Sequence, residues 1–372
     1  MMDTILNIGL NETTAAGITA ITADPAFATA CHQRLVAMYC DIVGVNRVPD
    51  DPWEQLRAAV EAVFRSWNGD RARSYRAHEG IQDDMATGVN VQAMVFGNRD
   101  DTSATGVVFT RNPATGEDVL YGDVLFNAQG EDVVAGTHAT ESLTTLDERM
   151  PHLSAELRRY ADILERHYTD VCDIEFTIEQ GKLWMLQTRI GKRSPQAALR
   201  IAVEMAADPE FPLTQAEAVH RVAEQLVDPP RVSAERDPDH PVATTGLPAS
   251  PGVVSGEIVT TPDAAVSTAA AGRPVILVRR ETSPDDVHGM AQSAGILTTT
   301  GGLASHAAVV ARGWGIPAVV GASAVSVESN RVTIGDRHLA PGDLITIDGT
   351  TGAVLIGAVG GESVTVPEAE VL

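Results

Sequence analysis

GILTTTGGLASHAAVVARGWGIPAVVG, residues 295–321, is the stretch from which the fold and the chemistry of this chain can best be predicted. Its apolar start favours a β-strand that ends at Thr298 to Thr300, and the two glycines that follow favour a tight turn. Ser305 is a typical helix N-cap, HAAVVAR has helical periodicity, and Gly313 stands where we expect the helix to end. His306 is therefore predicted to lie in the first turn of a helix.

The start of a helix is a favourable place for a phosphorylated histidine. Unpaired N–H groups and the positive end of the helix dipole stabilise a phosphoryl group, and the dipole also favours the neutral, nucleophilic imidazole. Gly301 and Gly302 would let a phosphate approach the backbone, and Ser305 would help to position it. A histidine after two glycines is more often structural or at the surface, so this pattern alone leaves both interpretations open.

Length and composition are those of an ordinary globular protein. The 372 residues, 44% hydrophobic and 21% charged, are enough for two or three domains. The formal net charge of -23 argues against nucleic acid and anionic membranes as partners. We find no run of about 18 apolar residues and no basic signal-peptide start, so we expect a cytoplasmic protein. The cysteines form no CxxC pair, which favours buried thiols over a disulfide or a zinc site.

The pattern along the chain changes from helix to mixed structure. Residues 1–90 favour helices, including WEQLRAAVEAVFRSW at 53–67, and NVQAMVFG at 90–97 and TGVVFT at 105–110 favour strands. Further helices are predicted at 155–168, 197–207 and 214–227, before a linker rich in proline and charge at 228–241. PVILV, GILTTT, AVVG and LITID then alternate with short helical pieces, which indicates a second, compact α/β domain.

A predicted hairpin between the helical segments carries residues that suit a nucleotide and a metal. DIEFTI alternates strictly between apolar and polar residues. The apolar face is predicted to carry Ile174, Phe176 and Ile178, and the polar face Asp173, Glu175 and Thr177. On the return strand we expect one face to carry Leu183, Met185, Gln187 and Arg189. Carboxylates can hold Mg²⁺ and an arginine can clamp phosphate oxygens. The exposed face of any antiparallel sheet carries similar residues, so spacing alone does not decide.

The wider pattern resembles a known family. The string at 301–321, with GLPASPGVVSGEIV at 246–259 and ETSPDDVHGM at 281–290, resembles the phosphohistidine domain of the phosphoenolpyruvate-utilising enzymes. The first half, from MMDTILNIGLN to DIEFTIEQGKLWMLQTRIGKR, resembles the pyruvate phosphate dikinase family within that group, and the likeness runs from Met1 to about Ala358. The resemblance implies an α/β (α+β) fold. Its parts are a partial ATP-grasp nucleotide-binding region with a helical segment (1–190), a helical arm and linker (191–245), a swivelling β/β/α phosphohistidine domain (246–358) and a tail (359–372).

The resemblance also implies an activity. In the family's reaction ATP pyrophosphorylates the histidine, inorganic phosphate takes the terminal phosphoryl group, and the phosphohistidine passes its group to pyruvate. ATP is then a substrate, Mg²⁺ a cofactor and His306 the catalytic residue. The implied nucleotide-binding residues are Glu131, Glu175, Gln187 and Arg189, and the implied metal ligands are Asp173, Glu175 and Gln187. Arg111 is interpreted either as a phosphate contact or as a surface residue. Five other histidines are interpreted as structural or surface residues, namely His167, His220, His240, His288 and His338.

The chain also departs from the family pattern. The family's N-terminal lobe, which grips the ATP phosphates, and its C-terminal barrel for pyruvate and phosphoenolpyruvate find no counterpart, so we expect a truncated member. A partner chain that supplies these lobes, or a homodimer, stays open. Relatives regulated by phosphorylation carry a threonine where Ala304 stands, and a family arginine is replaced by Thr300, which would weaken phosphate contacts. The alternative function is a non-catalytic phosphocarrier module or a decayed fragment.

Overall fold

The computed structural model describes residues 3–78, 80–82, 84–134, 140–233, 240–328, 331–359 and 363–365. The density of internal contacts divides the chain between Val95 and Phe96 into two compact units. The division predicted from the sequence, with boundaries after residues 190, 245 and 358, stays a prediction. In the described residues no helix is both long enough and apolar enough to cross a bilayer.

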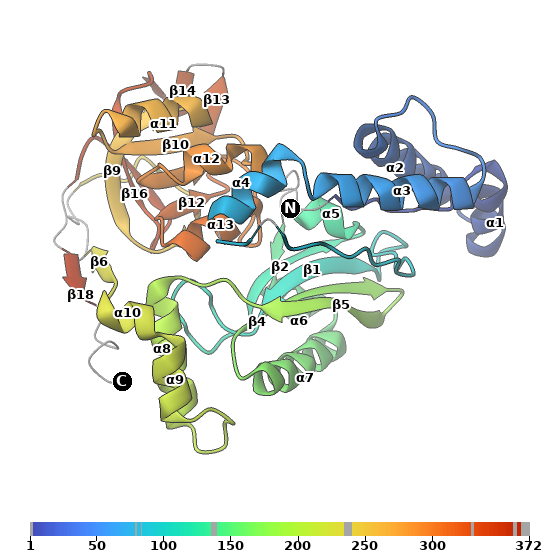
Figure 1. The fold of residues 1–372 in the computed structure, drawn as a ribbon, viewed down its shortest axis with the longest axis horizontal. Helices are drawn as coiled ribbons and strands as arrows, with labels where there is room; N and C mark the ends of the chain where they lie inside the picture. The colour runs from blue at the N-terminus through green and yellow to red at the C-terminus, as the bar shows by residue number, and fades with distance from the viewer. Residues whose placement is uncertain are drawn as a thin grey trace. The chain divides into compact units, whose positions relative to one another are not determined.

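The first unit is helical in its described residues (Figure 1). Its helices are α1 (Glu12–Thr22), α2 (Pro25–Val43), α3 (Pro52–Ser66) and α4 (Asp70–His78). α3 confirms the predicted helix at 53–67. Its buried side chains include the polar Gln55, because the Gln55 amide binds the backbone of Gly9, Leu10 and Pro49 at 2.8 to 3.0 Å. The predicted strand at 90–97 was wrong, because no described strand pairs with this segment.

The second unit begins with a five-stranded antiparallel sheet of order β3-β2-β1-β4-β5. Its strands are β1 (Ala104–Phe109), β2 (Tyr121–Phe126), β3 (Glu141–Ser142), β4 (Cys172–Glu179) and β5 (Lys182–Ile190). Helices α6 (Leu143–Arg149) and α7 (Pro151–Tyr168) bury one face of this sheet, where Leu153, Leu157 and Ala161 pack in one cluster with Ile174, Phe176 and Ile178. The predicted helix at 155–168 and the apolar face of the hairpin are thereby confirmed, and α5 (Gly130–Val134) contacts β1 and β2.

The hairpin of β4 and β5 contains a β-bulge that was not predicted from the sequence. The ladder register shifts between Glu175 and Phe176, because β5 holds one extra residue there. The bulge reverses the side-chain alternation of β5, so the prediction that four of its residues share one face was wrong. The core side carries Leu183 and Met185, whereas the polar side carries Gln187 and Arg189, opposite Glu175 and Asp173.

A helical arm leads to the last part of the second unit. α8 (Pro195–Ala207) confirms the predicted helix at 197–207, but the helix predicted at 214–227 is interrupted at Val222, between α9 (Gln215–Arg221) and α10 (Ala223–Val227). Inside the predicted linker, β6 (Arg231–Ser233) pairs with β18 (Ser363–Thr365) of the predicted tail. The remaining tail residues, 360–362 and 366–372, lie outside the described residues, as do linker residues 234–239.

The last part has the predicted β/β/α layers, built on an eight-stranded mixed sheet of order β7-β17-β16-β9-β10-β11-β12-β8. The strands are β7 (Thr244–Thr245), β8 (Leu247–Ser250), β9 (Val253–Val259), β10 (Val275–Arg279), β11 (Gly295–Thr298), β12 (Ala318–Val320), β16 (Leu344–Asp348) and β17 (Ala353–Ile356). One face packs against α11 (Pro262–Ala270), α12 (Val287–Met290) and α13 (His306–Trp314). The other packs against a small sheet of β13 (Val325–Glu328), β14 (Arg331–Ile334) and β15 (Arg337–Leu339). The strands β9 to β12 are parallel, so their carboxyl ends meet at one edge.

Candidate active site

α13 begins at His306, which confirms the prediction that this residue lies in the first turn of a helix. Ser305 has the extended backbone of an N-cap, with φ -63° and ψ 159°, but its side chain makes no capping hydrogen bond. The helix continues through Gly313 and ends at Gly315, whose φ of 67° is left-handed. The predicted end was therefore wrong by two residues, because the left-handed position that glycine favours is Gly315.

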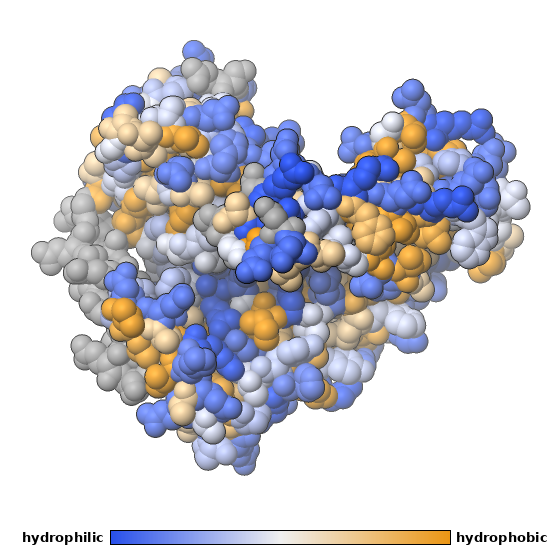
Figure 2. All heavy atoms as spheres, viewed as in Figure 1, coloured by the Kyte–Doolittle hydropathy of each residue, from blue (hydrophilic) through white to orange (hydrophobic). Residues whose placement is uncertain are grey.

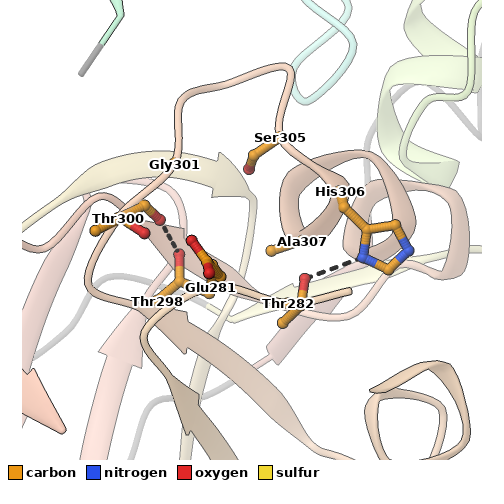
Figure 3. Close-up of a pocket in the computed structure, with 8 residues that line it drawn as sticks. All are labelled: Glu281, Thr282, Thr298, Thr300, Gly301, Ser305, His306 and Ala307. Atoms are coloured by element: carbon orange, nitrogen blue, oxygen red, sulfur yellow. Dashed lines mark hydrogen bonds between the residues drawn. The ribbon is translucent and has the colours of Figure 1, made fainter. Parts of the chain in front are cut away.

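The imidazole of His306 is oriented by a threonine from the neighbouring strand end. Thr282 Oγ1 lies 3.0 Å from His306 Nδ1 (Figure 3). Thr282 follows β10 and His306 follows β11, and these strands pair in parallel, so both residues stand at the same edge of the sheet. When Nδ1 carries the proton and donates it to Thr282, the lone pair of the neutral ring is on Nε2. This tautomer makes Nε2 the nucleophilic atom.

A small polar pocket adjoins the ring. Gly301, with φ +100°, forms the turn at its wall and Ala307 closes one side (Figure 3). Of the residues predicted to position phosphate, Gly301 and Ser305 line this pocket, whereas Gly302 is not among its lining residues. The polar lining residues are Glu281, Thr282, Thr298, Thr300, Ser305 and His306.

Gly302 instead permits a close approach of the five-stranded sheet. A Cβ atom at Gly302 would stand 2.4 Å from Thr140 Oγ1 and 2.6 Å from Asp123 Oδ2. Asp123, on β2, accepts a hydrogen bond from the Ala304 N–H at 2.8 Å and one from the Thr140 hydroxyl at 3.1 Å. Burial raises the pKa of the Asp123 carboxyl, and these hydrogen bonds oppose the rise. Sequence reasoning missed Asp123; the alternation in YGDVLF, residues 121–126, could have placed it on one face of a strand with Tyr121.

The loop before His306 is also held from inside its own domain. Arg312 is fully buried, and its guanidinium donates to the Leu303 carbonyl at 2.7 Å and to the Ala249 carbonyl at 3.2 Å. Burial lowers the pKa of Arg312, and the charges of Tyr121, Asp123 and Asp173 oppose this shift. Arg312 thus binds the carbonyl of residue 303 and Asp123 binds the next N–H, so the two side chains hold one short piece of backbone from opposite sides. Ala304 itself is buried among Val107, Phe109 and Val133.

The predicted nucleotide and metal residues of the hairpin lie on the same sheet face as this contact. Cross-strand pairs form two rows on that face, and their members come from β2, β1, β4 and β5. The first row is Asp123, Val107, Glu175 and Gln187. The second row is Tyr121, Phe109, Asp173 and Arg189. The structure therefore brings four predicted ligands and the loop before His306 to one face, although they are far apart in sequence.

The carboxylates of the hairpin are paired with an arginine. Arg189 Nε lies 2.8 Å from Asp173 Oδ2, and its Nη2 lies 3.5 Å from Glu175 Oε1. Burial raises the pKa of Glu175, with Arg189 opposing the rise. The other oxygen of Asp173, Oδ1, is buried without a hydrogen-bond partner in the described part of the chain. These oxygens and that of Gln187 fit a hard cation, although the described residues contain no group of three or more His, Cys, Asp or Glu placed to hold a metal.

Several predicted residues have other surroundings. Glu131 lies in α5. Arg111 is buried and not at the surface, because Glu165 and Glu204 bind its guanidinium at 3.0 and 2.9 Å. His240, His288 and His338 make single hydrogen bonds of 3.1 Å to Ile356, Asp263 and Thr333, which fits their structural interpretation. The free thiols are Cys31, Cys40 and Cys172, and burial raises the pKa of Cys172 to about 11.

Comparison with known proteins gives consistent matches along the chain. The family model described as "Pyruvate phosphate dikinase, AMP/ATP-binding domain" matches residues 1–152 and 150–209, and that described as "PEP-utilising enzyme, mobile domain" matches residues 271–352. Pyruvate, phosphate dikinase of Rhizobium meliloti is 44% identical over 96% of this chain and 46% of its own length. The chloroplastic pyruvate, phosphate dikinase 1 of Arabidopsis thaliana is 42% identical over 96% of this chain and 42% of its own length. The chain thus spans less than half the length of these curated relatives.

Proposed function

Because this chain belongs to the pyruvate phosphate dikinase family, we propose that it is a phosphotransferase that carries phosphoryl groups from ATP on His306 towards pyruvate or phosphoenolpyruvate. The observation that carries the proposal is the place of His306. It is the first residue of α13, its Nδ1 is 3.0 Å from Thr282 Oγ1, and the loop before it contacts the sheet face of the predicted nucleotide residues.

The chemistry of the histidine follows from its tautomer. The Nε2 lone pair attacks a phosphorus atom of the donor, an N–P bond forms, and the P–O bond to the leaving group breaks with its electron pair on oxygen. Positive charge develops on the ring in this step, and the hydrogen bond from Nδ1–H to Thr282 Oγ1 stabilises it. The backbone N–H groups at the start of α13 stabilise the phosphoryl group once it is on the ring.

The polar face of the hairpin is assigned to the nucleotide. Glu131, Glu175, Gln187 and Arg189 would contact ATP in this proposal, and oxygens of Asp173, Glu175 and Gln187 would hold Mg²⁺. The unpartnered Oδ1 of Asp173 supports a cation at this place, because a buried carboxylate oxygen lacks water as a ligand. When bound, Mg²⁺ would neutralise charge on the phosphates. Arg189, which now binds both carboxylates, would turn to phosphate oxygens.

The phosphohistidine domain at 246–358 is proposed to swivel on the arm at 191–245. Family membership supports this, since a carrier must meet both the nucleotide and the second acceptor. We assign the pyruvate step to a separate barrel domain and leave open whether another chain or a second copy of this one takes part.

The test is phosphoryl transfer to His306. The full chain is incubated with labelled phosphoenolpyruvate and the barrel domain of a related dikinase, beside the variants His306→Ala and His288→Ala. We expect acid-labile label in the unaltered chain and in His288→Ala, whose imidazole is on the surface. Label that persists in His306→Ala, or that survives acid, refutes the proposed function.

A further inference from the structure

The helix α3 buries small and polar side chains and exposes large apolar ones. Its buried residues are Gln55, Ala59 and Ala62. Trp53 is 73% exposed and Phe64 is 48% exposed, although both side chains are aromatic. A helix of a globular protein normally turns its apolar face towards a packing partner. The described structure therefore leaves part of the apolar surface of α3 uncovered.

The exposed aromatic residues belong to one row on the helix surface. Side chains three or four positions apart are neighbours on an α-helix, and this spacing joins Trp53, Leu56, Val60 and Phe64, which we call the α3 row. Leu56 and Val60 are half-buried. Figure 2 shows hydrophilic side chains along α3 with apolar ones beside them. A single exposed apolar residue needs no explanation, whereas a row of them is typical of an interaction surface.

Charged residues of alternating sign lie along one side of the α3 row. In chain order they are Glu54, Arg57, Glu61 and Arg65, and all four are exposed. None of them forms an ion pair with another residue that the structure describes. The order minus, plus, minus, plus becomes plus, minus, plus, minus when it is read from the other end. Two such helices in antiparallel orientation therefore place opposite charges side by side, whereas a parallel pair in register places like charges together.

We propose that the α3 row is a contact surface for a second copy of this chain, which binds through its own α3 in the antiparallel orientation. A two-fold axis near the middle of α3 brings Trp53 of each copy opposite Phe64 of the other, so that the same surface is used twice. The same axis places Arg57 of each copy beside Glu61 of the other. The proposal concerns assembly and does not depend on the phosphorylation of His306.

The size of the surface predicts a weak dimer. The 15 residues of α3 span about 22 Å, so one pair of these helices buries less than the roughly 1,200 Å² at which standard stable interfaces begin. The formal charge of -23 on each copy adds repulsion. In about 0.15 M salt the screening length is about 8 Å, which reduces this long-range repulsion but leaves adjacent charges on α3 able to interact. We expect a dissociation constant on the order of 10 µM.

Sedimentation equilibrium of the full chain at about 1 to about 200 µM measures the dimer. We expect a mass that rises with concentration towards that of two chains. Trp53→Gln and Phe64→Gln should each raise the dissociation constant about tenfold, because aromatic residues carry much of the energy of an interface. Val227→Gln is the matched control, since Val227 is an apolar residue of α10 that is 87% exposed, and it should leave the dissociation constant unchanged. Thermal unfolding checks that all three variants are folded.

An exchange of charges tests the orientation of the two helices. Arg57→Glu gives α3 two glutamates at positions 57 and 61, and Glu61→Arg gives it two arginines there. Each variant alone should dimerise at least about tenfold more weakly, because like charges then meet across the interface. Mixed in equal amounts, the two variants should form a heterodimer in which every glutamate lies beside an arginine. A loss of stability within a single helix does not produce this recovery.

Three outcomes would overturn the proposal. The first is a chain that stays monomeric up to about 200 µM, which would leave the α3 row to a different protein. The second is a dimer whose dissociation constant is the same in Trp53→Gln, Phe64→Gln and the unaltered chain, which would place the contact elsewhere. The third is a mixture of the two charge variants that dimerises no better than either variant alone, which would show that the two α3 helices do not meet in antiparallel orientation.

Discussion

Replacing Asp123 by alanine should release the loop before His306 from the five-stranded sheet without unfolding either part. The carboxylate accepts the Ala304 N–H at 2.8 Å, and this amide is buried. A buried donor left without an acceptor costs about 1–3 kcal/mol. Thr140, the second donor, is half-exposed, so water can replace the carboxylate there. We therefore take about 2 kcal/mol as the loss, which corresponds to roughly 30-fold in the docking equilibrium.

Hydrogen exchange of the Ala304 amide measures this loss. We expect its exchange to accelerate roughly 30-fold in Asp123→Ala, while the unfolding temperature changes little, because the clusters on either side of the contact keep their own cores. Asp336→Ala is the control, since this exposed carboxylate lies in the turn between β14 and β15. Unchanged exchange at Ala304, or an equal acceleration in the control, would contradict the reasoning.

A second prediction concerns how the contribution of Asp123 to stability depends on pH. Burial raises the pKa of Asp123 above its value in the unfolded chain. Such a group contributes stability below the unfolded pKa, and that contribution is lost as the pH rises through the folded pKa. Asp123→Asn keeps an acceptor for the Ala304 N–H but does not titrate. The free energy of unfolding of Asp123→Asn minus that of the unaltered chain should therefore rise from about pH 4 upward. Urea unfolding at a series of pH values measures this difference, and a difference that does not change with pH would contradict the prediction.

Three further predictions follow from contacts described above. Gly302→Ala would place a Cβ 2.4 Å from Thr140 Oγ1, so exchange in the loop should accelerate, whereas Gly17→Ala, on α1 with no neighbour within 4 Å and no left-handed backbone, should leave it unchanged. Arg111→Met leaves the buried Glu165 carboxylate without its counter-charge, with only the Thr110 hydroxyl still donating to it, and should cost about 3 kcal/mol of unfolding free energy in urea. Adding Glu165→Leu should recover part of this loss. Calorimetry with Mg·ATP should show weaker binding in Glu175→Gln; identical affinity would remove the hairpin from the proposed site.

Local signals gave a correct prediction of the helix and strands on which the candidate site residues lie. The start of α13 is predicted by Ser305 and by the apolar periodicity after it. Both signals come from residues within one or two helical turns of the helix start. The strands β4 and β5 follow from alternation and from the turn at Gln180 and Gly181, whose φ angles are 49° and 72°. The resemblance to the family added the β/β/α architecture, and it also added the prediction, which stays a prediction, that His306 carries the phosphoryl group.

Alternation could not show the bulge in β5. One extra residue moves the side chains of all later residues of β5 to the opposite face of the sheet. Nothing in LWMLQTR distinguishes a leucine in a bulge from one in a regular strand. Periodicity likewise predicted the helix at 53–67 but could not show that Gln55 is buried, because the three backbone groups that bind its amide lie outside the helix. In both cases the deciding partners lie outside the local window.

By itself, then, the sequence determined which residues start the helix that carries His306 and which carboxylates and arginine stand on the hairpin, because helix caps, turns and alternation depend on consecutive residues. Only the tertiary structure decided that Asp123 binds the backbone of Ala304, 181 residues away, and that Gly302 serves this contact. It also decided that Ser305 and Glu281 each keep a buried oxygen without a partner. The physical reason is that burial and hydrogen bonding at this site are properties of strands brought together from distant parts of the chain.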